Sequence, residues 1–130
     1  MKEINVSLQF GTEFEGTLQA DDRQIAIGRE VGGMGPYELL LGALGSCYYA
    51  TFISIARKMR LEYEGVDIAI HGVKRDKVPE TLQTVEMTIT IRGAQDEKGF
   101  DRASELAAKY CSVHETIVQV ADIALELRFA

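Results

Sequence analysis

The chain has 130 residues, of which 46% are hydrophobic and 26% are charged, a composition typical of a globular protein with a buried core. Its formal net charge of −6 disfavours nucleic acid and anionic membrane surfaces, because both attract Lys and Arg. It shows no secretory leader and has two cysteines, so a cytoplasmic location is expected, where a disulfide is transient or catalytic. The length favours a single domain over residues 1–130.

The first third of the chain alternates polar and apolar side chains. Residues 3–10 alternate strictly, which predicts a half-buried strand. Weaker alternation over residues 14–18 and 25–27 predicts two more strands, and Asp21 and Asp22 form a turn signal between them. The expected arrangement is an antiparallel meander.

An uncharged stretch from Leu39 to Ala56 occupies the centre of the chain. Because Pro36 suits the first position of a helix, one long helix from Pro36 to Met59 is predicted. Its apolar residues cover most of the circumference, so the helix is expected to be buried nearly all round. A soluble protein is favoured over a membrane span, since the run is slightly short and contains several polar residues.

The second half of the chain predicts three more strands and two helical stretches. They are the strands 66–72, 85–91 and 123–129 and the helical stretches 96–110 and 113–120. The complete order is three strands, a long helix, two strands, helices and a strand. Strands and helices in this order indicate an α+β fold.

Two cysteines are the main candidates for chemistry. Cys47 and Cys111 both lie in apolar helical segments, where a free cysteine is often only a small buried hydrophobe. His114 follows Cys111 by three positions, which places both on one face of a continuous helix and leaves hydrolase or acyl-transfer chemistry open. His71 alternates with the apolar residues of its strand and is expected at the surface. These four residues lack the close spacing of a zinc site, and no metal is expected.

Three short motifs carry a resemblance to a known family. The long helix opens with Gly33-x-x-Pro36-x-Glu-Leu-Leu and continues with Gly42-Ala-x-Gly-Ser-Cys47. The second cysteine stands in Tyr-Cys111-Ser-Val. With the order of strands and helices, these motifs resemble the OsmC/Ohr family of thiol-dependent peroxidases over the whole chain.

The resemblance implies an OsmC-like fold in which antiparallel sheets wrap around long central helices in an intertwined homodimer. It also implies that Cys47 attacks a hydroperoxide and becomes a sulfenic acid, which Cys111 resolves as a disulfide. An external dithiol would return both residues to thiols, and no cofactor is implied. A partner helix would explain why the long helix is apolar all round.

One position departs from the family pattern at the start of the helix. The peroxidase branches carry a glutamate at the position of Tyr37, where it holds an arginine that stabilises the thiolate. Glu38 stands one residue later, and the nine residues from Glu38 to Cys47 turn about 900°, which places the two on opposite sides of the helix. A role for Glu38 in capping the first turn is the other interpretation.

A second departure follows the second cysteine, where Ser112 replaces the usual proline. The groups that could support a thiolate are Arg29, Arg23, Glu38, Tyr37 and His114. Because burial disfavours the charged form, the pKa of Cys47 is expected to be raised unless an arginine reaches it. Weak peroxidase activity is therefore expected.

Three functional hypotheses follow. The first is an OsmC-like peroxidase that reduces small hydroperoxides through Cys47 and Cys111 in oxidative-stress defence. The second is a non-enzymatic protein of the same fold that binds a small hydrophobic molecule at the dimer interface. The third is the hydrolase or acyl-transfer chemistry of Cys111 and His114.

Overall fold

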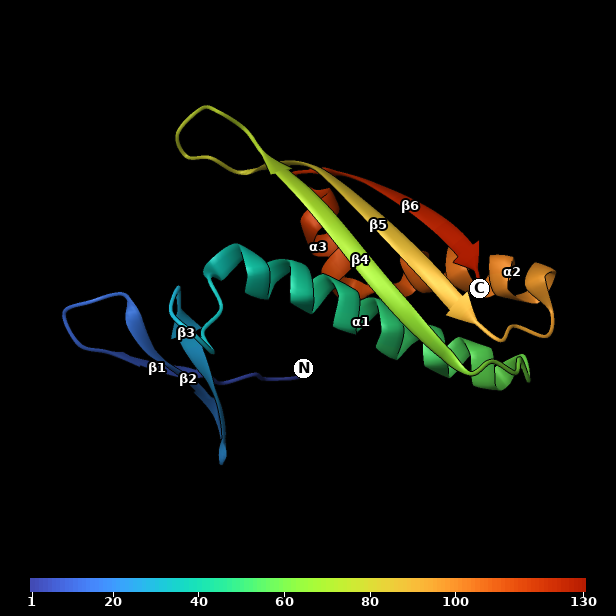
Figure 1. Cartoon of the computed structure of the whole chain (residues 1–130), viewed down its shortest axis with the longest axis horizontal. Helices are drawn as coiled ribbons and strands as arrows, with labels where there is room; N and C mark the ends of the chain where they lie inside the picture. Colours follow the sequence, from blue (N-terminus) through green and yellow to red (C-terminus); the bar gives the residue numbers. More distant parts are fainter. The chain divides into compact units, whose positions relative to one another are not determined.

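The computed structural model describes residues 1–130 (Figure 1). The chain forms two compact units, Met1–Leu40 and Leu41–Ala130, which are described separately. Both units contain a three-stranded sheet. The strands and helices together give an α+β fold, as the order of elements in the sequence predicts.

The N-terminal unit is an antiparallel meander of β1 (Ser7–Phe10), β2 (Glu15–Ala20) and β3 (Arg23–Gly28). The predicted strand order is confirmed. The prediction that residues 3–10 form a half-buried strand is wrong in two respects, since the strand begins at Ser7 and all four of its residues are exposed. Alternation in the sequence shows which side chains share a face, but burial also requires a second layer on that face.

Apolar residues of this sheet line up across the strands. Leu8 pairs with Leu18, and Leu18 pairs with Ile25 in the next strand. Leu8 nevertheless remains 53% exposed and Ile25 remains 48% exposed. The N-terminal sheet therefore has an apolar face that its own unit leaves largely uncovered.

Helix α1 (Pro36–Lys58) confirms the long helix that the sequence predicts. Its start is closed by a hydrogen bond from the Gly35 N–H to a Glu38 carboxylate oxygen at 2.8 Å. This bond is half of a capping box, so the capping role considered for Glu38 is confirmed. The basic residues Arg57 and Lys58 lie in the last turn, where they complement the negative end of the helix.

The expectation that α1 is buried nearly all round is wrong within this chain. Its large buried side chains form one stripe with a spacing of four residues: Leu44, Tyr48, Phe52 and Ala56. By length and composition α1 is apolar enough to cross a membrane, and 28% of its most apolar window is buried. The buried stripe packs into the core of the C-terminal unit, where Phe52 stacks on Phe100 with ring centroids 6.1 Å apart.

The C-terminal sheet has the order β4 (Gly65–Lys74), β5 (Leu82–Arg92) and β6 (Asp122–Phe129). Strands β4 and β5 are antiparallel, whereas β5 and β6 are parallel. The expectation of antiparallel sheets is therefore corrected for the pairing of β5 with β6. Parallel neighbours need a long crossover, which α2 (Glu97–Tyr110) and α3 (Ser112–Val118) provide.

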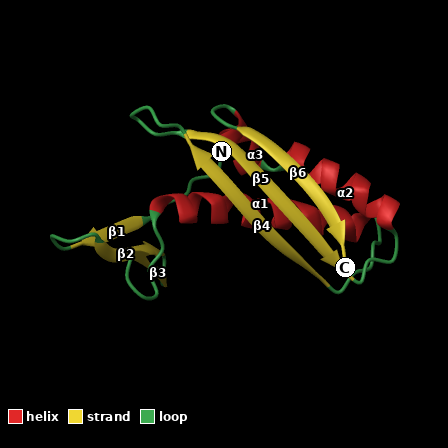
Figure 2. Ribbon diagram, turned by 45° about the horizontal axis from the view of Figure 1, so that its top comes forward, coloured by secondary structure: helices red, strands yellow, loops and turns green.

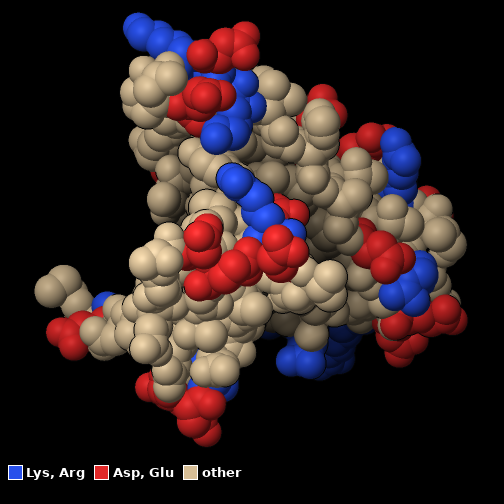
Figure 3. Space-filling model, turned by 60° about the vertical axis from the view of Figure 1, so that its left-hand side comes forward, with Lys and Arg blue, Asp and Glu red and all other residues tan.

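All three helices lie on one face of the C-terminal sheet (Figure 2). Close packing of α1 against β4 depends on Gly45, where an added Cβ would come within 3.1 Å of the Ile70 side chain. On β5, Val85, Met87, Ile89 and Ile91 are buried, which confirms the predicted alternation of that strand. Acidic and basic side chains are interspersed with uncharged surface on the face drawn in Figure 3.

Candidate active site

Cys47 lies in the middle of α1, next to the buried stripe. The following residue, Tyr48, is completely buried, whereas Cys47 itself is half-buried. The Tyr48 hydroxyl lies 2.7 Å from the hydroxyl of Ser104 on α2, so the two helices are joined by a buried hydrogen bond beside the cysteine. The position of Cys47 is thus fixed by α1 packing against α2.

Cys111 lies at the break between α2 and α3 and is completely buried. Its backbone is extended, with φ −77° and ψ 115°, so it ends one helix and caps the next. The Cys111 sulfur accepts a hydrogen bond from the main-chain N–H of His114 at 3.4 Å. Cys111 therefore takes the place of the Ser, Thr or Asp that usually caps a helix.

The two cysteines meet where α3 begins. Hydrogen bonding from the Cys111 thiol and from the main-chain N–H groups of Ser112 and Val113 lowers the pKa of the Cys47 thiol. The Ser112 hydroxyl lies 3.8 Å from the same sulfur. The first N–H groups of a helix have no partner within it. Here the His114 N–H donates to the Cys111 sulfur, and those of Ser112 and Val113 lower the pKa of Cys47.

Two opposing effects set the pKa of Cys47. Desolvation raises it, whereas hydrogen bonds from the Val113 N–H, the Cys111 thiol and Ser112 lower it. The hydrogen bonds prevail, so the pKa of Cys47 is lower than that of an ordinary cysteine. Burial raises this pKa as expected, but the expectation that the pKa stays raised without an arginine is wrong, because the sequence does not show that uncharged donors from a distant segment act on the sulfur.

The pKa of Cys111 is shifted in the opposite direction. Burial raises it most strongly, and the neighbouring Cys47 sulfur raises it further, although the His114 N–H partly counteracts both. Cys47 is thus the thiol that ionises more readily, and Cys111 is the thiol that keeps its proton. This order matches the roles of attacking and resolving cysteine that the resemblance implies.

The expected Cys111–His114 pair is not found. The helix is broken at Cys111, so the two residues do not share one face of a continuous helix. His114 contacts the Cys111 sulfur through its main-chain N–H. A main-chain N–H cannot serve as the general base that nucleophilic catalysis needs, and the hydrolase or acyl-transfer hypothesis loses its basis.

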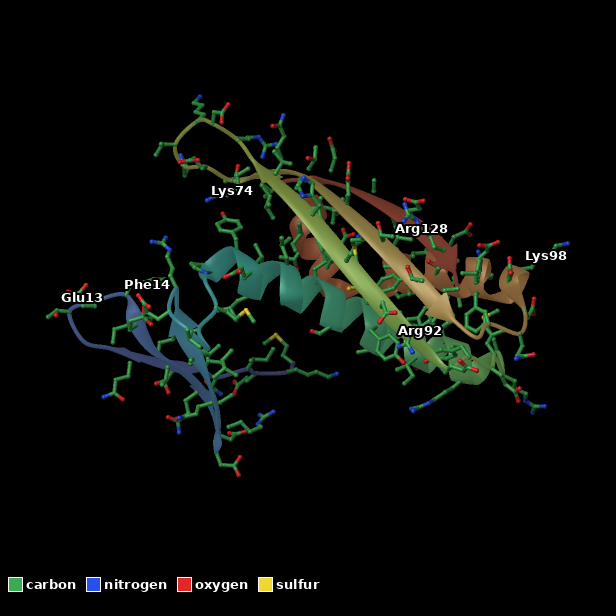
Figure 4. All side chains as sticks on the ribbon, viewed as in Figure 1. Glu13, Phe14, Lys74, Arg92, Lys98 and Arg128 are labelled. Atoms are coloured by element: carbon green, nitrogen blue, oxygen red, sulfur yellow. The ribbon has the colours of Figure 1, made fainter.

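The candidate arginines belong to the N-terminal unit. Arg23 lies 3.4 Å from Asp21 in an exposed ion pair beside the β2–β3 turn. Arg29 stacks over the Phe14 ring, with its guanidinium carbon 5.6 Å from the ring centroid. Figure 4 labels Phe14 and the neighbouring Glu13 in this unit. That either arginine supports the Cys47 thiolate stays a prediction.

Tyr37 is half-buried in the first turn of α1 and has an interaction partner. Its part in supporting the thiolate also stays a prediction. His71 is exposed on β4, as expected. Among residues 1–130, no three His, Cys, Asp or Glu side chains group together as metal ligands.

Four cations of the C-terminal unit are labelled in Figure 4: Lys74, Arg92, Lys98 and Arg128. Arg92 pairs with Asp67 at 2.9 Å, and Arg128 pairs with Glu126 at 3.0 Å. Both pairs are exposed, and such pairs contribute little to stability. The guanidinium groups of both arginines are engaged at the sheet surface.

Two functional contributions were missed by sequence reasoning. The main-chain N–H groups that surround Cys47 have no signature in side-chain chemistry, although Ser112 in place of a proline was a clue, since proline has no N–H to donate. The buried Tyr48–Ser104 hydrogen bond was also missed. Tyr48 and Ser104 are uncharged and lie 56 positions apart in the sequence, so no local pattern predicts their contact.

Two shallow grooves flank α1 in the C-terminal unit. One, of about 420 Å³, is lined by Thr51, Ser54, Ile55, Lys58, Leu106 and Tyr110. Its lining begins about one helical turn after Cys47, because the Thr51 hydroxyl donates to the Cys47 carbonyl at 3.0 Å, and it includes Tyr110, which precedes Cys111. The other, of about 340 Å³, lies between α1 and β4 and is lined by residues that include Leu41, Gly45 and Ile70.

Solved structures share this fold. A hypothetical protein from Aquifex aeolicus VF5 is 28% identical, with a TM-score of 0.86 over 100% of this chain and 99% of that one. An OsmC-like protein from Mycoplasma pneumoniae is 19% identical, with a TM-score of 0.89 over 99% and 98% of the two chains. An organic hydroperoxide resistance protein OsmC from Legionella pneumophila is 14% identical, with a TM-score of 0.76 over 98% of both chains.

No curated protein sequence matches this chain. The family described as OsmC-like protein matches residues 28–126, which include α1, both cysteines and most of the C-terminal sheet. This match covers well over half of the chain, and the OsmC and Ohr structures share its fold. The chain is a member of the OsmC-like protein family.

Proposed function

We propose that this protein is a thiol-dependent peroxidase that reduces small organic hydroperoxides. The Cys47 thiolate attacks the outer oxygen of the hydroperoxide, the O–O bond breaks, and the alkoxide leaves with a proton as the alcohol. Cys47 becomes a sulfenic acid. The Cys111 sulfur then attacks the Cys47 sulfur, which forms a disulfide and releases water. An external dithiol reduces the disulfide and is itself oxidised.

The observation that supports this proposal is the contact between two unlike thiols. Cys47 is half-buried and has the lowered pKa that a nucleophile needs. Cys111 is buried, has a raised pKa and donates a hydrogen bond to the Cys47 sulfur. A resolving thiol that is already in contact with the attacking sulfur can act as soon as the sulfenic acid forms.

The fold likeness supports the same substrate class. The Legionella pneumophila structure and the OhrB structure from Bacillus subtilis are both described as organic hydroperoxide resistance proteins. The groove that begins at Thr51, one helical turn after Cys47, includes the apolar side chains of Ile55, Leu106 and Tyr110 in its lining and suits an organic substituent. We place the protein in the cytoplasm, where a dithiol reductant is present.

We also propose that the working form is a homodimer. Much of α1 and the apolar face of the N-terminal sheet are exposed in one chain. Exposed apolar surfaces of this kind mark interfaces. A second copy of the chain would cover them.

Peroxide consumption tests the proposed activity. With cumene hydroperoxide and dithiothreitol, the wild-type protein is expected to turn over many equivalents. Cys47→Ser is expected to consume none. In a separate reaction without dithiothreitol, Cys111→Ser is expected to react once and then stop as the sulfenic acid, which dimedone would trap. Equal consumption by wild type and Cys47→Ser would refute the proposal.

A second candidate function is the binding of a small hydrophobic molecule without catalysis. The two grooves along α1, of about 420 and 340 Å³, are the observation that favours it. The functions are distinguishable, because binding of a fluorescent apolar probe would survive Cys47→Ser and peroxide consumption would not. A wild-type protein that binds the probe and consumes no peroxide would favour this second function.

A further inference from the structure

We propose that Ser112 is a catalytic residue that holds the Cys47 sulfur in its thiolate form, with its hydroxyl and its main-chain N–H as the two donors. This inference rests on the proposed peroxidase function and adds a residue to that site. It assigns Ser112 direct contact with the reacting atom. The hydroxyl oxygen lies 3.8 Å from the Cys47 sulfur, within the range of hydrogen bonds to sulfur.

The chemistry of the two groups decides which of them donates. A neutral thiol and a hydroxyl can each donate to the other, and no charged state is favoured by that exchange. A thiolate has no proton and only accepts, so the Ser112 hydroxyl must donate to it. Hydrogen bonds to a charged acceptor are stronger than those to a neutral one, and the contact therefore favours the thiolate.

The backbone at Ser112 supplies the second donor. Ser112 is the first residue of α3, and its N–H has no partner within the helix. Cys111 is extended rather than helical, so the chain turns directly before Ser112, and hydrogen bonding by the Ser112 N–H lowers the pKa of Cys47. One residue thus contributes two donors, and the next residue, Val113, contributes a third.

Among the residues near Cys47, Ser112 is the one to which we assign the role of holding the thiolate. The titratable group in contact with Cys47 is the Cys111 thiol. On α3, His114 and Glu115 follow, and the His114 N–H is already used by Cys111. On α2, Lys109 lies over the Tyr110 ring, with its nitrogen 5.4 Å from the centroid.

Alkylation of Cys47 as a function of pH tests the role without relying on peroxidase activity. Purified full-length protein would be treated with iodoacetamide from pH 5 to 10, and modification of the Cys47 peptide would be followed by mass spectrometry. Ser112→Ala loses only the hydroxyl. It is expected to lower the rate of Cys47 alkylation at pH 6 about threefold, and to raise the midpoint of the alkylation–pH curve by about half a pH unit. Ser112→Pro loses both donors and is expected to lower that rate about tenfold.

Two variants separate this role from a structural one. Ser112→Thr keeps both donors and is expected to retain the wild-type midpoint. Ser46→Ala is the matched control, because Ser46 adjoins Cys47 but donates to the Ala43 carbonyl at 3.2 Å, within its own helix. Loss of structure would raise alkylation of Cys47 and Cys111 together at every pH, whereas loss of donors moves the Cys47 midpoint upwards.

The outcomes separate the two proposals. Unchanged midpoints in Ser112→Ala and Ser112→Pro would overturn the role of Ser112, whatever the peroxidase activity. If Ser112→Pro fails to fold, Ser112→Ala is sufficient for the test: an alkylation midpoint equal to that of Ser46→Ala would overturn the role of Ser112. A raised midpoint in a protein that consumes no peroxide would support Ser112 as the donor to Cys47 and refute the proposed peroxidase function.

Discussion

The buried hydrogen bond between Tyr48 and Ser104 should stabilise the fold through an interaction that neither hydroxyl can replace with water. The two hydroxyl oxygens are 2.7 Å apart, and Tyr48 and Ser104 are 0% and 2% exposed. Tyr48 lies on α1 and Ser104 on α2, so this bond joins the helix that carries Cys47 to the helix that leads to Cys111. Tyr48→Phe and Ser104→Ala each remove one partner.

Removal of either hydroxyl leaves the other buried without its best partner. An unsatisfied buried hydroxyl costs about 1–3 kcal/mol, whereas a satisfied neutral hydrogen bond contributes about 1 kcal/mol net. We expect Tyr48→Phe to lower the free energy of unfolding by about 2 kcal/mol. Ser104→Ala should cost about 1.5 kcal/mol, because the remaining Tyr48 hydroxyl still has the Ser104 carbonyl at 3.5 Å. The double variant should cost about as much as Tyr48→Phe alone, a coupling energy of roughly 1–1.5 kcal/mol.

Urea unfolding at one fixed protein concentration measures all four proteins of this cycle. The midpoints should shift while the dependence on urea stays constant, since the surface exposed on unfolding does not change. Tyr49→Phe is the control, because the Tyr49 hydroxyl lies 2.7 Å from that of Tyr63 in a part-buried position that water can reach. This control should cost about 0.5 kcal/mol. Additive costs for Tyr48→Phe and Ser104→Ala would refute the reasoning.

The pH dependence of the same bond gives a second check. Burial raises the pKa of Tyr48 to about 12, above the value of about 10 for an unfolded tyrosine. A raised pKa of the folded state favours the protonated form, so this contribution is complete below pH 10 and is lost as the pH rises towards 12. Wild-type stability should therefore fall over that interval more steeply than that of Tyr48→Phe. Equal slopes would contradict the assignment.

Three further predictions concern assembly and redox chemistry. Sedimentation at micromolar concentration should show a dimer, because α1 and the N-terminal sheet expose too much apolar surface in one chain, and a stable folded monomer would contradict this. Mild oxidation should remove the thiols of Cys47 and Cys111 together and leave chains that separate on a non-reducing gel, since the two are in contact within one chain; a cross-linked dimer would count against it. Tyr37→Glu should lower the Cys47 pKa and raise the peroxidase rate if Arg23 or Arg29 reaches the thiolate, and Cys47→Ser should be inactive in the same background. Because α3 already lowers the Cys47 pKa, the gain in rate should be at most about tenfold. An unchanged Cys47 pKa would exclude both arginines.

Much of the local structure could be predicted from the sequence. The span of α1 follows from Pro36 at its start, the absence of charge from Leu39 to Ala56 and the basic residues that follow, and the structure differs from the prediction by one residue at the end. The alternation over residues 85–91 fixed which side chains of β5 are buried. Periodicity determines these features because it depends only on the geometry of one helix or strand.

The family resemblance also depended on local sequence, since the motifs around Cys47 and Cys111 pointed to the OsmC-like fold that the comparisons show. The pairing of strands that lie far apart in the sequence could not be predicted from local sequence. The parallel pairing of β6 with β5 depends on the path of the α2–α3 crossover, and the exposure of β1 depends on what covers its sheet. Neither is encoded in the alternation of a single strand.

The direction of the Cys47 pKa shift was decided by tertiary structure. From the sequence, a buried cysteine without a nearby charge should have a raised pKa, and this was expected of Cys47. The fold brings the start of α3 to its sulfur, where uncharged donors from Val113, Cys111 and Ser112 outweigh desolvation. Main-chain N–H groups are present at nearly every residue and carry no mark in the sequence. Only the three-dimensional path of the chain determines which of them lose their helical partners and converge on one sulfur atom.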